Sequence, residues 1–86
     1  MTQVKHVVLD VLKPHHPNVL ELAQALAAQG PSYRVRIEVE TVDEKTETVV
    51  IEIEADDVDY EAVAAAITAL GGSVHSIDRV EVHGAA

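Results

Sequence analysis

Two segments that are far apart in the sequence carry side chains able to bind a ligand or to transfer a proton. The first is residues 12–17 (LKPHHP), and the second is residues 71–78 (GGSVHSID). Imidazoles bind divalent metals or exchange protons near neutral pH, and hydroxyls and carboxylates add oxygen ligands. These two segments are therefore the first candidates for a functional site.

The first segment combines two prolines, which fix the backbone, with a lysine and two imidazoles. We predict that Lys13, His15 and His16 bind a ligand, either a metal ion or an anion at the start of the following helix. The alternative is a rigid loop with solvated side chains, in which His16 only caps that helix.

The second segment places a hydroxyl and an imidazole directly after a flexible glycine pair. We predict that Ser73 and His75 also bind the ligand. The alternative is that the glycines only end a helix. His75 and Asp78 interrupt a strand otherwise built largely of valine and isoleucine, and such polar groups need partners.

A third set of residues would place carboxylates on one face of a sheet. Oxygen-only clusters of this kind suit calcium or magnesium, although a charged face that simply meets water is the favoured explanation. Valines among them predict that another subunit covers part of this face. The carboxylates are Asp10, Glu38, Glu40, Glu52 and Glu54.

The metal prediction combines residues of the second segment and of the sheet face with two carboxylates of the turn at 43–47. We expect a divalent cation, with calcium or magnesium favoured and zinc as the alternative. The predicted metal ligands are Asp10, Asp43, Glu47, His75 and Asp78.

Hydrophobic periodicity predicts the elements that must position these residues. Strict alternation indicates strands, apolar residues three and four apart indicate helices, and broken alternation near residues 76–78 indicates a β-bulge. The prediction is a strand at 4–12, a helix at 17–29 ended by a left-handed Gly30, and strands at 33–42 and 48–55 around a turn at 43–47. A second helix then starts near Asp59 and ends at Gly71, and a strand follows at 74–82.

The order β-α-β-β-α-β predicts an α+β, ferredoxin-like sandwich, a four-stranded antiparallel sheet with two helices on one face. We expect one domain over residues 1–83 and a disordered tail at 84–86. In this fold both strand–helix junctions and the central hairpin share one end of the sheet. His15, Asp43, Glu47 and His75 would then become neighbours.

Composition restricts the partners. Fifteen acidic residues against six Lys and Arg give a net charge of −9, which disfavours nucleic acid and anionic membranes. Cysteine is absent, so disulfides and thiolate metal sites are excluded. No apolar run approaches the ~20 residues of a membrane span, and a cytoplasmic location is the default expectation. A domain this small gains from self-association.

Three stretches resemble the archaeal domain-of-unknown-function family 211: residues 8–15 (VLDVLKPH), 42–47 (VDEKTE) and 71–78 (GGSVHSID). The resemblance covers almost the whole chain. It implies a small ferredoxin-like protein that forms homo-oligomers, rings among them, associates with divalent metal and has no assigned catalytic residue. The family pattern maps onto Asp10, Lys13, His15, Asp43, Glu47, His75 and Asp78.

The leading hypothesis is a homo-oligomeric binding or regulatory module that holds a divalent metal or small ligand at the sheet end. A second hypothesis is an amino-acid-sensing module resembling ACT domains, which share this fold. A third is a small enzyme that uses His75 or His15 as acid or base. Nucleophilic catalysis by Ser73 or Ser76 with His75 is disfavoured because neighbours in one strand point to opposite faces and no oxyanion hole is identifiable, so we expect no enzyme.

Overall fold

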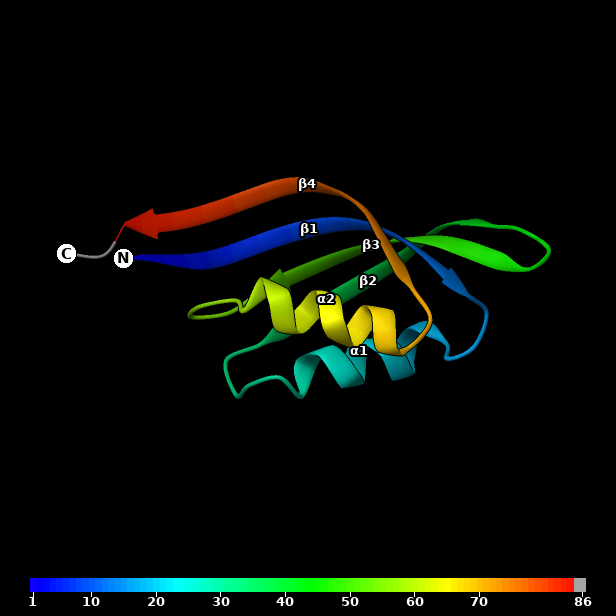
Figure 1. Cartoon of the computed structure of the whole chain (residues 1–86), viewed down its shortest axis with the longest axis horizontal. Coiled ribbons are helices and arrows are strands. Elements are labelled where there is room, and N and C mark those ends of the chain that lie inside the picture. The colour runs from blue at the N-terminus through cyan, green and yellow to red at the C-terminus, as the bar shows by residue number, and fades with distance from the viewer. Residues whose placement is uncertain (85–86) are drawn as a thin grey trace.

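The structure, a computed structural model, describes residues 1–84 and has a ferredoxin-like α+β fold. The sheet is antiparallel with strand order β2-β3-β1-β4, and both helices lie on one of its faces (Figure 1). The predicted order of elements is therefore confirmed. The elements are β1 (Thr2–Pro14), α1 (Val19–Ala27), β2 (Arg34–Val42), β3 (Thr46–Glu54), α2 (Tyr60–Ala69) and β4 (Ser73–Gly84).

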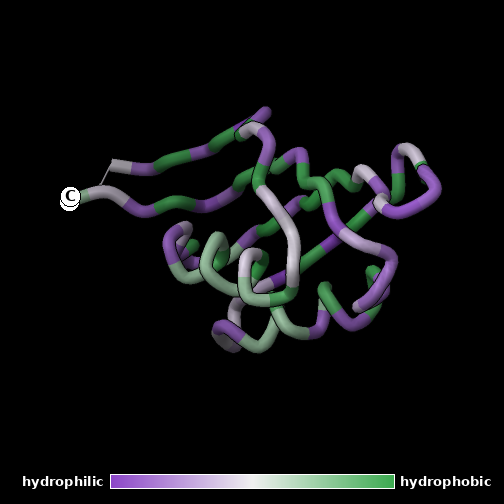
Figure 2. Tube along the Cα trace, turned by 45° about the vertical axis from the view of Figure 1, so that its right-hand side comes forward, coloured by the Kyte–Doolittle hydropathy of each residue, from purple (hydrophilic) through white to green (hydrophobic). Residues whose placement is uncertain are grey.

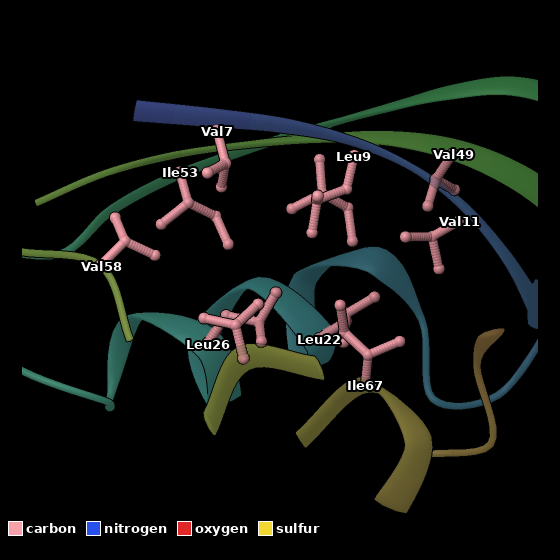
Figure 3. Close-up of a cluster of buried hydrophobic side chains, with 11 residues drawn as sticks. Val7, Leu9, Val11, Leu22, Leu26, Val49, Ile53, Val58 and Ile67 are labelled. Carbon is pink, nitrogen blue, oxygen red and sulfur yellow. The ribbon is translucent and has the colours of Figure 1, made fainter. Parts of the chain in front are cut away.

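The core lies between the sheet and the helix pair. Between Val7 and Lys13 the odd-numbered residues of β1 face the helices, and Val7, Leu9 and Val11 are paired with Ile53, Ile51 and Val49 of β3. Figure 3 shows the labelled side chains of β1 and β3 pointing from the sheet toward Leu22, Leu26 and Ile67 on the helices. Even-numbered residues of β1 from His6 onward consequently point to the opposite surface of the sheet, which we call the open face.

Helix α1 is shorter than predicted at both ends. Asn18 is its N-cap, since its side chain accepts the amide of Glu21 at 2.9 Å while Glu21 reaches back to the amide of Asn18. This capping box starts the helix after Pro17 and leaves His16 outside it. Gly30 has no positive φ, so its predicted role as a left-handed cap is wrong.

Helix α2 ends in a Schellman motif that turns the chain back into the sheet. Gly71 has φ +88°, and it is the predicted glycine stop. The amides of Gly72 and Gly71 donate to the carbonyls of Ile67 and Thr68 at 2.9 and 3.0 Å. The turn therefore delivers Ser73 directly to the start of β4.

Strand β4 contains the predicted bulge and a second one. The pairing with β1 shifts between Arg79 and Ile77 and again between Ser76 and Val74, which leaves Asp78 and His75 as the extra residues. These shifts place Val74, Ile77 and Val80 opposite core-facing residues of β1 despite their mixed spacing. The bulges thus reconcile the broken alternation of the sequence.

The β2–β3 turn is tighter than predicted. Thr46 and Glu47, expected in the turn, belong to β3, and the amide of Asp43 donates to the carbonyl of Thr46 at 2.8 Å. Glu47 is therefore paired directly with Lys13 of β1. This pairing requires Glu47 to lie in the strand and not in the turn.

The β1–β4 ribbon extends past the helices at the end where both termini lie, which elongates the molecule to 48 × 22 × 18 Å (Figure 1). Figure 2 shows alternating hydrophobic and hydrophilic residues along this ribbon. Gly84, expected in the tail, is paired with Thr2, and residues 85 and 86 lie outside the described part. None of the helices in residues 1–84 is long and apolar enough to span a membrane.

Candidate functional site

The two segments identified in the sequence meet at one end of the sheet. Leu12 of β1 is paired with Ser73 of β4, and Lys13 is paired with Glu47 of β3. The β1–α1 loop, the β2–β3 hairpin and the α2–β4 turn therefore share a rim. The shared rim on which the predicted site depended is present.

An ion pair between Lys13 and Glu47 anchors this rim. The Lys13 side chain is 2% exposed, and its ammonium donates to Glu47 Oε1 at 2.6 Å and to the Pro14 carbonyl at 2.7 Å. Lys13 lies on the core side of β1, beyond Val11, where a charge needs a partner to be tolerated. The adjacent ammonium lowers the pKa of the Glu47 carboxyl, burial raises it in part, and His15 lowers it further.

His15 ties the β1–α1 loop to the hairpin. Its Nε2 lies 3.1 Å from the carbonyl oxygen of Glu44, and its Nδ1 lies 3.5 Å from Glu47 Oε2. Both partners are acceptors, so a neutral imidazole can donate to one and an imidazolium to both. Glu47 is thus engaged by two cationic or donor groups from the first segment.

A groove of about 190 Å³ opens beside this ion pair. The α2–β4 turn forms one wall, since a Cβ placed on Gly71 would lie 3.3 Å from Pro14 Cγ. The lining has two hydroxyl side chains and apolar side chains, together with Lys13, whose ammonium donates to Glu47. Its lining residues are Leu12, Lys13, Pro14, Thr46, Gly71 and Ser73.

Asp10 and His75 do not lie with this ion pair but on the open face. Together with Leu12 and Thr48 they line a separate hollow of about 170 Å³. Alternation along β1 explains the division, because Asp10 and Lys13 differ by an odd number of residues. The residues expected in a single site are therefore divided between the two sides of the sheet.

The remaining predicted residues lie elsewhere on the surface. Asp43 is exposed at the hairpin turn, and His16 is exposed in the β1–α1 loop. Asp78 accepts a hydrogen bond from the Ser76 hydroxyl at 2.6 Å. Within residues 1–84 no three of the five predicted metal ligands bring ligand atoms within 4.8 Å of one another in a single protomer. Their binding of metal stays a prediction.

A charged network on the open face was missed by the sequence analysis. Arg36 Nε donates to Glu52 Oε1 at 2.8 Å, and its Nη2 pairs with Glu54. His6 Nε2 lies 2.6 Å from Glu52 Oε2. Arg36 and then His6 lower the pKa of Glu52 to about 2, and Arg36 also lowers the pKa of Glu54.

This network includes His6, Glu52 and Glu54, whose potential ligand atoms lie within 4.8 Å of one another. Among residues 1–84 they are the group close enough together to hold a metal ion. Both of its carboxylates are already paired with Arg36, so a cation would have to displace the guanidinium. The arrangement stabilises the pairing of β2, β3 and β1 without an ion. Arg36 lies directly opposite Glu52 because the pairing of β2 with β3 shifts by one residue between Val39 and Thr41, so the length of the turn alone did not predict this pair.

Comparison with known proteins places the chain in a family whose activity is not assigned. The family DUF211, described as uncharacterized ArCR, matches residues 5–86. An uncharacterized protein of the archaeon Methanocaldococcus jannaschii, MJ0319, is 38% identical over 80 residues, which are 93% of this chain and 82% of that protein.

Proposed function

The chain belongs to the DUF211 family, and we propose that it is a homo-oligomeric binding module that holds a small polar ligand in the groove at the end of the sheet. The observation that carries the proposal is the meeting of three segments, distant in sequence, around this groove. Register brings them together, because β1 pairs Lys13 with Glu47 on one side and Leu12 with Ser73 on the other. A ligand bound there would contact all three.

The size and lining of the groove favour a ligand as small as a free amino acid. Pockets for drug-sized molecules measure roughly 300–1,000 Å³, whereas this groove measures about 190 Å³. Lys13 is among the lining residues, and its positive charge favours a carboxylate ligand there. The hydroxyls of Thr46 and Ser73 add hydrogen-bonding groups, and Leu12 and Pro14 add apolar contact.

At this rim a small ligand is favoured over a divalent cation. None of the lining residues is acidic, and the two oxygens of Glu47 at this rim are already engaged by Lys13 and His15. A metal would have to break the ion pair with Lys13 and leave a buried ammonium uncompensated. An amino-acid-sensing role, the second hypothesis from the sequence, is therefore the more specific form of the proposal.

Self-association is supported by apolar side chains along β4. Ile77, Val80 and Val82 are 49%, 57% and 49% exposed, and β4 is an edge strand whose outer side is unpaired among the described residues. Exposed apolar residues beside a free strand edge favour pairing with another chain. A second copy of this chain is the partner that the proposal requires.

A thermal-shift screen tests the ligand site. The probes are the twenty amino acids together with small mono- and dicarboxylates. At one hundred times its Kd, a bound compound adds about 2.7 kcal/mol to the stability of the folded state and raises Tm. We expect at least one compound to do so, and we expect Ser73→Ala and Thr46→Val to reduce its effect.

Thr68→Ala is the matched control, because Thr68 is an exposed hydroxyl residue on α2 away from the groove lining. It should leave the ligand-induced shift unchanged. The proposal is wrong if no compound raises Tm, or if the groove variants respond as strongly as the control does.

A further inference from the structure

Asp10, which lines the hollow on the open face, has a carboxylate oxygen without a partner among the described residues. Asp10 Oδ1 is buried and accepts no hydrogen bond within the described residues, and it is the one such side-chain atom there. A buried acceptor without a donor costs roughly 1–3 kcal/mol, and more when it is charged. Something that satisfies this oxygen would therefore be bound favourably.

A bulge in β4 brings the His75 imidazole to the hollow that Asp10 lines. Ser76 is paired with Asp10 and Val74 with Val11, so His75 is the extra residue between them. Val74 faces the helices with Val11, whereas both Ser76 and His75 lie toward the open face. In a regular strand two consecutive residues would not share a side, and the bulge is the reason that they do.

The charge around the hollow favours a cation. Asp10 forms no salt bridge within residues 1–84, whereas Glu52 and Glu54 on the same face are paired with Arg36. Glu38 occupies the same row of the sheet as Asp10, with Val50 between them. The whole chain carries a net charge of −9, which adds to the negative potential at this face.

We propose that Asp10 and His75 bind a divalent transition-metal ion such as Zn²⁺ on the open face. The Asp10 carboxylate and a His75 ring nitrogen supply the protein ligands, and the Thr48 hydroxyl lines the remaining side of the hollow. An imidazole nitrogen with a carboxylate oxygen suits zinc, whereas calcium takes six to eight oxygen ligands. The preference for calcium or magnesium expected from the sequence is thereby reversed at this position.

This site is independent of the proposed amino-acid groove. The two hollows share Leu12 and are otherwise lined by different residues. It is also distinct from the group of His6, Glu52 and Glu54, whose carboxylates already bind Arg36. The groove, the Asp10–His75 hollow and the His6–Glu52–Glu54 group can therefore be tested by substitutions at different residues.

Calorimetric titration of the metal-stripped, full-length protein tests the assignment. The probes are Zn²⁺, Mn²⁺, Ca²⁺ and Mg²⁺, each added alone. We expect Zn²⁺ to bind at least tenfold more tightly than Ca²⁺ or Mg²⁺. Asp10→Asn and His75→Gln should each weaken Zn²⁺ binding by at least tenfold, because loss of even an outer-shell partner typically costs 10–100-fold.

His83→Gln is the matched control, since His83 lies on the same strand but pairs with Glu81. It should leave Zn²⁺ affinity unchanged. His75 is exposed, so His75→Gln should keep the fold, and circular dichroism of each variant verifies this. Absence of Zn²⁺ heat in the wild type would overturn the proposal. Loss of binding in His6→Gln with retention in His75→Gln would overturn it also, by moving the metal to the other group.

Discussion

Lys13 is the residue that joins the core to the candidate site. It occupies the core-facing position that follows Val11 on β1, and its side chain is 2% exposed. An ammonium at such depth is stable because Glu47 and the Pro14 carbonyl accept its hydrogen bonds. The sequence places these acceptors on β3 and on Lys13's own strand, so the charge is satisfied only when the sheet end is assembled.

Lys13→Met should therefore destabilise the protein by roughly 2–3 kcal/mol, because it leaves the Glu47 carboxylate without its main partner in a largely buried position. We expect less than the full cost of a buried charge because Glu47 keeps 13% exposure and contact with His15. Urea unfolding measures the change, and Lys45→Met at the exposed hairpin turn is the control. Equal effects of the two substitutions would contradict a structural role for the ion pair.

Glu52 makes the free energy of unfolding depend on pH in the acidic range. Its pKa falls from 4.5 to about 2 in the folded state, so the folded protein binds fewer protons than the unfolded chain between these values. Its contribution is therefore complete above pH 4.5 and is lost as the pH falls toward about 2. Glu47 acts in the same direction because its pKa is lowered too.

We expect Glu52→Gln to flatten the loss of unfolding free energy between pH 4.5 and 2. Urea unfolding at a series of pH values in this range measures the slope. Glu40→Gln, at an exposed position of β2 without an ion pair among the described residues, should preserve the wild-type slope. A Glu52→Gln slope as steep as that of the wild type would show that the network with Arg36 does not form.

At the scale of elements, the α2–β4 turn determines the shape of the groove. Gly71 and Gly72 supply both hydrogen bonds of the Schellman motif and hold Ser73 beside Leu12. Gly71 has φ +88°, which a residue with a Cβ adopts only with strain. Its close approach to Pro14 also leaves little room for a side chain.

Gly71→Ala is expected to cost about 1–2 kcal/mol of stability and to weaken ligand binding in the groove. Gly84→Ala is the control, because its Cβ would meet nothing within 4 Å and its φ is not positive. Thermal unfolding compares the two. A Gly71→Ala protein as stable as Gly84→Ala would mean that the turn does not adopt the Schellman geometry.

Regular hydrophobic periodicity predicted most of the fold. The prediction of the site was limited by positions where the structure is irregular, such as bulges, helix ends and turns. Alternation located the strands, and the broken alternation of β4 correctly indicated a bulge. The helix limits were wrong at α1, because the capping box of Asn18 and Glu21 was overlooked in favour of Pro17. Register depended on hairpin length, and the turn was predicted two residues too long at Thr46 and Glu47.

The prediction grouped the site residues because their segments share one end of the sheet. It did not take into account that side chains on one strand point to two opposite faces. Lys13, His15 and Glu47 do meet, whereas Asp10 and His75 line the open face. The face of Asp10 could be read from alternation with Lys13. The position of His75 could not, because it depends on a second bulge that leaves no clear mark in the sequence.

At the scale of the whole molecule, the sheet has an unpaired edge with apolar residues beside it. The end of β4 extends past the helices in the β1–β4 ribbon (Figure 1), and Val80 and Val82 on β4 are 57% and 49% exposed. Net charge of −9 opposes indiscriminate association and favours a contact built around this apolar stripe. Pairing of β4 with a second copy would bury the stripe.

Size-exclusion chromatography with light scattering should therefore give the mass of an oligomer at moderate salt. Val80→Lys should reduce that mass to the 9.2 kDa of the monomer, since it places a charge within the apolar stripe. Leu20→Lys, at a position 64% exposed on α1, should leave the assembly intact. A monomeric wild type at high protein concentration would contradict self-association.

The central claim is that the end of the sheet, where three distant segments converge, binds a small ligand. Amide NMR spectra of ¹⁵N-labelled protein, recorded during titration with the amino acid or carboxylate that most raises Tm, test it most directly. The account predicts that the largest shifts fall together on Lys13, Thr46, Gly71 and Ser73, with smaller changes at the far end of the β1–β4 ribbon. Shifts confined to the open face or to the helices, with these four amides unmoved, would contradict it.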